Sequence, residues 1–86
     1  MIITLKGTEI DAPTGSGTAS NVGSARIVRC ANAGGTARLV TLEESGGTDI
    51  GTFTVPANGV QYVRKEASDK LFAAHADIKL AACAQN

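Results

Sequence analysis

The chain has 86 residues, the length of one small domain, and its eight acidic and eight basic side chains leave no net charge at neutral pH. Nucleic-acid-binding domains take much of their affinity from excess positive charge, so this balance argues against a nucleic-acid partner. The sequence also has no run of like charges that would bind a membrane surface, and no segment approaches the roughly 20 apolar residues that cross a bilayer.

The N-terminal third is predicted to contain one strand and a long polar loop. Residues 1–6 alternate as a strand does and lack the basic and long apolar regions of a signal peptide, so we expect synthesis in the cytoplasm. Residues 7–24 consist mainly of Gly, Ser, Thr, Ala and Asp, which predicts a loop or extended arm because such a segment buries little apolar surface. The glycines at 14–24 superficially resemble a phosphate-binding loop, but they lead into a strand rather than a helix.

The middle of the chain is predicted to form four strands. Four segments alternate their side chains with the two-residue period of a strand: residues 25–32, 37–43, 49–55 and 60–65. The short glycine-containing link at 33–35 predicts that the first two strands pair as a hairpin. The glycines of the turn at 45–47 tolerate the positive φ of a second tight hairpin, and the Pro-Ala-Asn-Gly sequence at 56–59 predicts another turn.

The segment RKEASDKLFAAH, residues 64–75, interrupts the strand pattern. We predict one short helical turn near residues 68–74, capped by Ser68 or Asp69, that carries the chain from one sheet to the other. Leu71 and Phe72 would then close one end of the core. A last strand is predicted at residues 77–83.

These elements predict an all-β fold, an antiparallel β-sandwich of about six or seven short strands that spans residues 1–86 as a single domain. The links between strands are too short for parallel crossovers. The core is expected to be small, because the chain has only two Phe, one Tyr and no Trp. We therefore expect a partner to add stability, through self-association or through docking on a larger assembly.

No catalytic, cofactor-binding or metal site is predicted. His75 is the plausible general base, but the sequence has no Gly-x-Ser-x-Gly nucleophile elbow, and Cys30 and Cys83 lie inside predicted strands. Both cysteines are expected to be buried thiols; a disulfide is the alternative, which synthesis in the cytoplasm disfavours. The acidic residues at 43–49 lack the spacing of a calcium-binding loop. We predict that the protein is not an enzyme.

A candidate interface is the local group of cations formed by Arg64, Lys65 and Lys70, with Phe72 as an apolar neighbour. Two interpretations remain open for these residues. They form either a solvated rim, in which Glu66 and Asp69 balance the charge, or a docking patch for an acidic protein surface.

Residues 25–86 resemble the small virion structural proteins of tailed bacteriophages, especially those of aquatic bacteria. The likeness lies in a strand like RIVRCAN, a hairpin like ARLVTLEESGGTDIGTFTV, an element like YVRKEASDKLFAA and a closing C-terminal strand. These are strand and turn patterns without a catalytic motif, so no functional residue is carried over.

The resemblance implies a structural component of the virion. Within that class we expect a capsid decoration, or cement, protein that binds the outer shell and stabilises it without catalysis. Its partners would be the major capsid protein or other virion proteins, and further copies of itself. It would be made in the host cytoplasm and located in the virion, on the capsid surface. A head–tail or tail accessory structural protein is the alternative within this class. A small surface- or carbohydrate-binding module is the alternative from another class.

Overall fold

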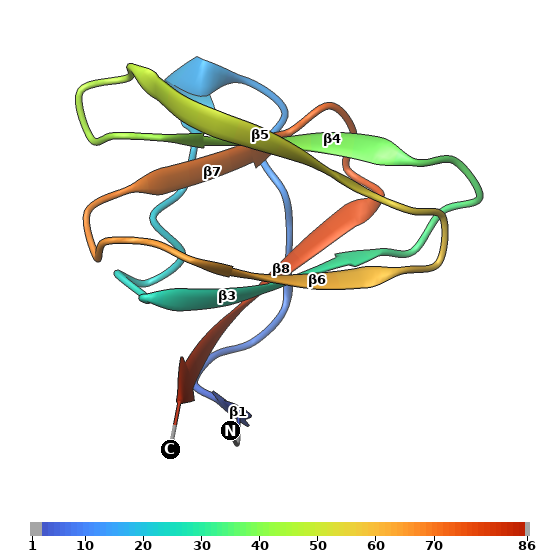
Figure 1. Ribbon diagram of the computed structural model, residues 1–86, viewed down its shortest axis with the longest axis horizontal. Coiled ribbons are helices and arrows are strands. Elements are labelled where there is room, and N and C mark those ends of the chain that lie inside the picture. The colour runs from blue at the N-terminus through green and yellow to red at the C-terminus, as the bar shows by residue number, and fades with distance from the viewer. Residues whose placement is uncertain (1–2, 86) are drawn as a thin grey trace.

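The structure is a computed structural model that describes residues 3–85, and it consists almost entirely of antiparallel strands (Figure 1). The strands are β1 (Ile3–Leu5), β2 (Ile10–Asp11), β3 (Ile27–Asn32), β4 (Arg38–Glu43), β5 (Asp49–Val55), β6 (Val60–Arg64), β7 (Lys70–Ala73) and β8 (Ile78–Gln85). One 3-10 turn, η1 (Ser16–Thr18), lies between β2 and β3. It supplies the helical structure among residues 3–85, so no helix there is long or apolar enough to cross a membrane.

The strands form two sheets that pack face to face. The five-stranded sheet has the order β1-β8-β3-β6, with β2 also paired to β8, and the three-stranded sheet has the order β5-β4-β7. Figure 1 shows them as two layers, with β4, β5 and β7 above β3, β6 and β8. Every pairing is antiparallel. The predicted all-β antiparallel sandwich is therefore confirmed.

The core lies between the two layers and is made of small and medium apolar side chains. It includes Val28, Cys30, Val40, Val55, Leu71, Ala73, Ile78 and Leu80, each at most 1% exposed. These residues alternate with outward-facing ones along their strands, as the pleat of a strand requires. Full burial of a Val, Leu or Ile contributes about 1.5–3 kcal/mol, so this thin core is the main source of stability.

The polar segment at 7–24 packs against the sandwich and joins its two layers. The Ala12 amide donates to the Ile78 carbonyl of β8 at 2.8 Å, and the Ala73 amide of β7 donates to the Pro13 carbonyl at 2.8 Å. Further along, Ser20 forms a bridge with Leu71, also of β7. Ala12 enters the core. The segment is therefore largely irregular but fixed to both sheets by backbone hydrogen bonds.

The hairpin predicted for residues 25–43 is wrong. β3 belongs to the five-stranded sheet and β4 to the three-stranded sheet, so the link at 33–37 crosses between the layers. Alternation shows which side chains share a face of a strand, but it does not identify the neighbouring strand. A short glycine-containing link can join two strands of one hairpin or two strands in different sheets. The hairpin expected at the 45–47 turn is confirmed, because β4 and β5 pair in register, and Gly47 adopts a φ of 96°.

The helical turn predicted near residues 68–74 is also wrong, because β7 (Lys70–Ala73) is a strand paired with β4. Before it, a tight turn is closed by the Asp69 amide, which donates to the Glu66 carbonyl at 3.0 Å. The Asp69 carboxylate accepts the Glu66 amide at 3.1 Å and so closes this turn instead of capping a helix. The short strand is stabilised by its ladder with β4, a long-range pairing that local propensity does not report.

The crossing itself was predicted correctly, since β6 lies in one sheet and β7 in the other. Leu71 is fully buried in the core, whereas Phe72 faces outward and is half-buried. The two-residue strand β2 lies inside the segment predicted as a loop, and the other strand boundaries agree closely with the sequence pattern. Of the strand predicted for residues 1–6, Met1 and Ile2 lie outside the described residues.

The two cysteines are free thiols on opposite faces of the five-stranded sheet. Cys30 faces the core from β3, and Cys83 of β8 pairs in register with Ile27 on the outer side. Burial, with a smaller contribution from Cys83, raises the pKa of the Cys30 thiol to about 12. Cys30 is therefore a packing residue rather than a nucleophile.

Candidate functional site

The four predicted interface residues do not share one surface. Arg64 ends β6 of the five-stranded sheet and Lys65 follows it, whereas Lys70 and Phe72 lie in β7 of the three-stranded sheet. They are neighbours in sequence but separate in space because the chain changes layers between them. Lys70 and Phe72 face outward, since the alternate residues of β7 are in the core.

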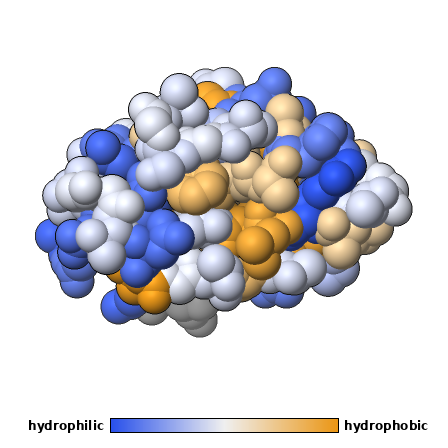
Figure 2. Space-filling view, turned by 90° about the horizontal axis from the view of Figure 1, so that it is seen from above, coloured by the Kyte–Doolittle hydropathy of each residue, from blue (hydrophilic) through white to orange (hydrophobic). Residues whose placement is uncertain are grey.

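Figure 2 shows the outer side of the three-stranded sheet, where an apolar area at the centre is flanked by hydrophilic residues. Leu39 and Ile50 are the large apolar residues that this sheet exposes. Lys70 is opposite Glu43 in the β4–β7 register. The Glu43 carboxylate is buried and accepts a hydrogen bond from the Ser16 hydroxyl at 2.8 Å. This bond holds η1 against the outer side of the three-stranded sheet.

Lys65 is a structural residue rather than an exposed docking cation. It is only 5% exposed, and its Nζ donates to the carbonyls of Glu66 at 3.2 Å and Ala67 at 3.4 Å. Loss of hydration lowers the pKa of Lys65, and the nearby Asp69 carboxylate opposes that effect. Lys65 therefore holds the turn between the layers and presents little charge to a partner.

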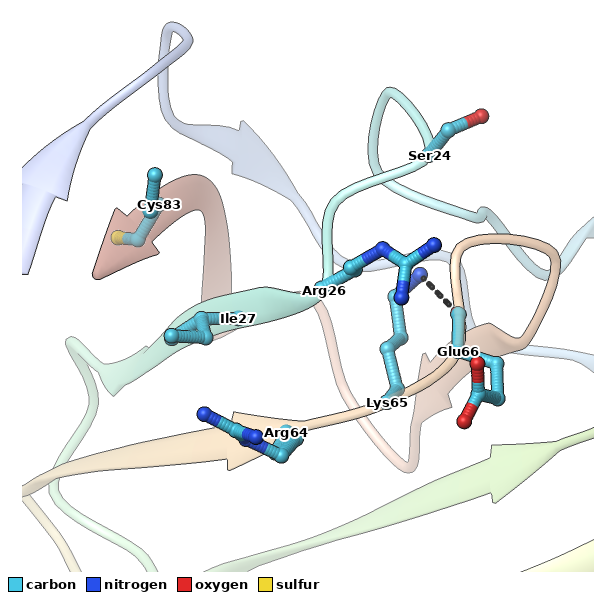
Figure 3. Close-up of a pocket in the computed structure, with 8 residues that line it drawn as sticks. Ser24, Arg26, Ile27, Arg64, Lys65, Glu66 and Cys83 are labelled. Atoms are coloured by element: carbon cyan, nitrogen blue, oxygen red, sulfur yellow. Dashed lines mark hydrogen bonds between the residues drawn. The ribbon is translucent and has the colours of Figure 1, made fainter. Parts of the chain in front are cut away.

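A shallow hollow of about 460 Å³ opens where the turn after β6 meets the start of β3. It is lined by Ser24, Arg26, Ile27, Arg64, Lys65, Glu66, Cys83 and Ala84. Figure 3 shows that the Arg26 and Lys65 side chains extend to the same side, whereas Arg64 extends away from them. Backbone contact fixes this arrangement, because the Lys65 amide donates to the Arg26 carbonyl at 2.9 Å. We call this feature the basic hollow.

Arg26 is the cation that the basic hollow leaves available. Its side chain is exposed, and no hydrogen bond or ion pair engages its guanidinium among the residues that the structure describes. Two other cations on the same sheet are paired: Arg29 contacts Glu9 at 3.1 Å, and Lys79 contacts Asp11 at 2.6 Å. Arg26 is therefore an exposed cation of this sheet that a partner can reach.

The basic hollow borders an apolar outer face of the five-stranded sheet. One row across the strands is Leu5, Cys83, Ile27 and Arg64, and the next contains Ala81, Arg29 and Tyr62. Leu5 is 64% exposed and Tyr62 is 52% exposed, and Val60 on β6 is exposed as well. We call the surface formed by Leu5, Ile27, Val60, Tyr62, Ala81 and Cys83 the apolar face; Leu5, Val60 and Tyr62 are its exposed part, and the other three residues are buried.

Arg26 and the apolar face were missed by sequence reasoning, although one signal pointed to the face. In the segment IKLAAC of β8, residues on both sides of the strand are apolar from Leu80 onward. A strand that is apolar on both faces indicates that both faces are covered, as in sheets with a layer on each side. Arg26 had no such signal, because only the fold brings it beside the turn after β6.

His75 lies in the turn before β8 and is exposed. Its Nδ1 accepts the backbone amide of Asp77 at 3.0 Å and lies 3.3 Å from the Asp77 carboxylate. The same carboxylate accepts the Arg38 guanidinium at 3.4 Å. These contacts close the turn that leads into β8.

No group of three or more His, Cys, Asp or Glu side chains is placed to hold a metal ion within the described part of the chain. Comparisons with protein-family models, curated proteins and solved structures found no match to this chain. The resemblance to phage virion proteins therefore remains a prediction from the sequence pattern. The basic hollow and the apolar face are therefore the features that can suggest a function.

Proposed function

We propose that the protein is a bacteriophage virion structural protein, specifically a capsid decoration protein that binds the outer shell and stabilises it without catalysis. The sequence pattern of residues 25–86 supports the virion class. The observation that carries the proposal is the apolar face, which exposes Leu5, Val60 and Tyr62. The exposed Arg26 lies at one end of the same sheet, and its side chain extends away from that face (Figure 3). A protein of this kind acts through its surface, and this surface has the composition of an interface.

In the proposed complex, the apolar face would contribute buried apolar area and Arg26 would contribute an ionic contact. Burial of exposed apolar area stabilises a complex by roughly 25 cal/mol per Å², and Tyr and Arg are the residues most enriched at interface hot spots. A partner that also contacts the end of the sheet would meet the exposed guanidinium of Arg26, where an acidic residue would fix the orientation of docking. A partner that binds only the folded state would also add to the stability of this thin-cored domain.

The proposal is tested by the copy number of the protein in purified particles, measured by quantitative mass spectrometry. A decoration protein follows the symmetry of the shell and is expected in roughly hundreds of copies. About a dozen copies or fewer would contradict capsid decoration and support the tail accessory alternative. Absence from particles would contradict the virion class altogether.

The docking surface is tested by charge reversal on each of the two faces. Arg26→Glu is expected to weaken attachment to particles about tenfold, because it replaces an attractive contact at the rim by a repulsive one. Lys70→Glu, on the other sheet, is the matched control and should leave attachment unchanged. Thermal unfolding of both variants checks that each remains folded. If only Lys70→Glu weakens attachment, the docking surface lies at β7. If Arg26→Glu leaves attachment unchanged, the basic hollow is not part of the docking surface.

A carbohydrate-binding module remains the second candidate because Tyr62 is an exposed aromatic ring, and sugar-binding sites stack aromatic rings on sugars. A glycan array probed with the full chain distinguishes the two proposals. Specific glycan binding without attachment to particles would favour the second candidate.

A further inference from the structure

β5 is an unprotected edge strand. It pairs with β4 on one side, and no other strand in the described part of the chain pairs with its second side. It has seven residues, of which Asp49, Ile50, Gly51, Thr52 and Thr54 are exposed. An edge of this kind presents unpaired backbone amides and carbonyls, which form a template for another strand.

The other edges of the sandwich are shorter or already covered. β1 has three residues and β2 has two. The free side of β7 contacts the 13–20 segment through backbone hydrogen bonds to Pro13 and Ser20. β6 has five residues and ends in Arg64, a charge that disfavours pairing. β5 is therefore the longest open edge.

Edge strands usually carry a device that blocks pairing, such as a lysine, a proline or a bulge. Residues 50–55 contain no charged residue and no proline. The register shift between β4 and β5 lies between Leu42 and Glu43, opposite the first residues of β5. It leaves residues 51–55 in regular strand geometry, so the open edge has no such protection over that length.

We infer that β5 pairs with β5 of a second copy of this chain, antiparallel, with the two-fold axis through Thr52. This axis places Thr52 opposite its own counterpart and Gly51 opposite Phe53 of the second copy. A two-fold contact is isologous, so every pair occurs twice. The two three-stranded sheets become one continuous six-stranded sheet.

The side chains of β5 are complementary to themselves in this register. A Cβ built on Gly51 would have no atom within 4 Å, so the space beside Gly51 is open. Phe53 of the second copy, which is partly buried against its own core, would lie opposite this open space, and an aromatic ring paired across strands with glycine is a stabilising combination. The central threonines form a favourable cross-strand pair, and the charged Asp49 lies beyond the bulge at the start of β5, outside the regular part of the register.

The inference does not depend on the proposed function, because β5 and the apolar face belong to different sheets. A single strand pair buries much less than the roughly 1,600 Å² of a standard interface. Dimerisation is therefore expected to be weak and visible only at high protein concentration. On a particle, where copies would be held close together, a weak contact gains from high effective concentration.

The test is sedimentation velocity of the full chain from about 10 μM to about 1 mM, because a dissociation constant of 1 mM is near the weak limit of specific association. Wild type should shift from monomer to dimer over this range. Thr52→Lys should weaken self-association about tenfold, because it places two like charges directly opposite each other at the axis. Thr52→Glu should do the same. Ser45→Lys, an exposed position in the β4–β5 turn, adds the same charge away from the edge and should behave as wild type.

Mixing the two Thr52 variants distinguishes this register from any other. Lys and Glu then face each other across the axis, so a one-to-one mixture should regain dimerisation at least equal to wild type. Hydrogen exchange should show concentration-dependent protection confined to residues 49–55. A monomer at 1 mM, unchanged association of Thr52→Lys, no recovery on mixing, or protection elsewhere would each overturn the inference.

Discussion

Replacement of Asn32 by alanine is predicted to be among the most destabilising changes in this protein. Asn32 is only 2% exposed. Its Nδ2 donates to the carbonyls of Thr36 at 2.7 Å and Val55 at 3.1 Å, and its Oδ1 accepts the Gly34 amide at 2.9 Å. One side chain thus ties the end of β3 to the crossing between layers and to the end of β5.

Three hydrogen bonds, each worth about 1 kcal/mol net, give an expected loss of about 3 kcal/mol for Asn32→Ala. A domain of 86 residues has a total stability of about 4–13 kcal/mol, so this loss is a large share. At 4–8 °C per kcal/mol, the melting temperature should fall by roughly 12–24 °C. Far-UV circular dichroism is the suitable assay because the chain has no tryptophan.

The matched control is Asn21→Ala. Asn21 is exposed, and its Oδ1 accepts one amide, that of Ser24, at 3.3 Å. This change should cost less than about 1 kcal/mol. If Asn32→Ala lies within 1 kcal/mol of wild type, or if the control is equally destabilising, Asn32 does not hold the layers together.

Two further predictions concern buried geometry and thiol chemistry. Gly34→Ala should destabilise by about 1–3 kcal/mol, because its new Cβ would collide with the Asp77 carboxylate and would displace it from Arg38. Equal stability of Gly34→Ala and wild type in urea titrations would show that the Asp77 side chain moves aside without cost. In a Cys83→Ser variant, the native Cys30 thiol should react with a disulfide reagent at pH 8 much more slowly than in denaturant, because burial, the larger cause of its raised pKa, remains when Cys83 is removed. Comparable rates of labelling would mean that β3 opens readily.

Strand positions could be predicted from the sequence because they follow from local alternation. The segment DIGTFTV was predicted at residues 49–55 and occupies those residues as β5. The pairing of strands depends on contacts that are remote in sequence. β3 pairs with β6 and β8, not with β4, which follows it in sequence. The two-residue alternation of side chains in β3 does not distinguish among these possible partners.

The errors in the candidate site have the same origin. Arg64, Lys65 and Lys70 are close in sequence, and the sequence prediction placed them on one surface for that reason. The turn after β6 instead buries Lys65 and sends Lys70 to the other sheet. Arg26 joins Lys65 at the basic hollow through a backbone hydrogen bond across 39 residues of sequence, and only the tertiary structure shows it. Charge clusters in small β proteins are therefore better sought after the strand order is known.

The outer residues of β3 and β8 connect this fold to its proposed role. An antiparallel sheet with a solvated outer face usually alternates apolar and polar residues. β8 instead places Ala81 and Cys83 on the outer side, next to Ile27, and the chain itself buries all three, whereas the neighbouring β1 exposes Leu5. An exposed apolar surface costs solubility and becomes favourable only when a partner covers it. The exposed part of this face consists of Leu5, Val60 and Tyr62, and the proposed docking would cover these residues.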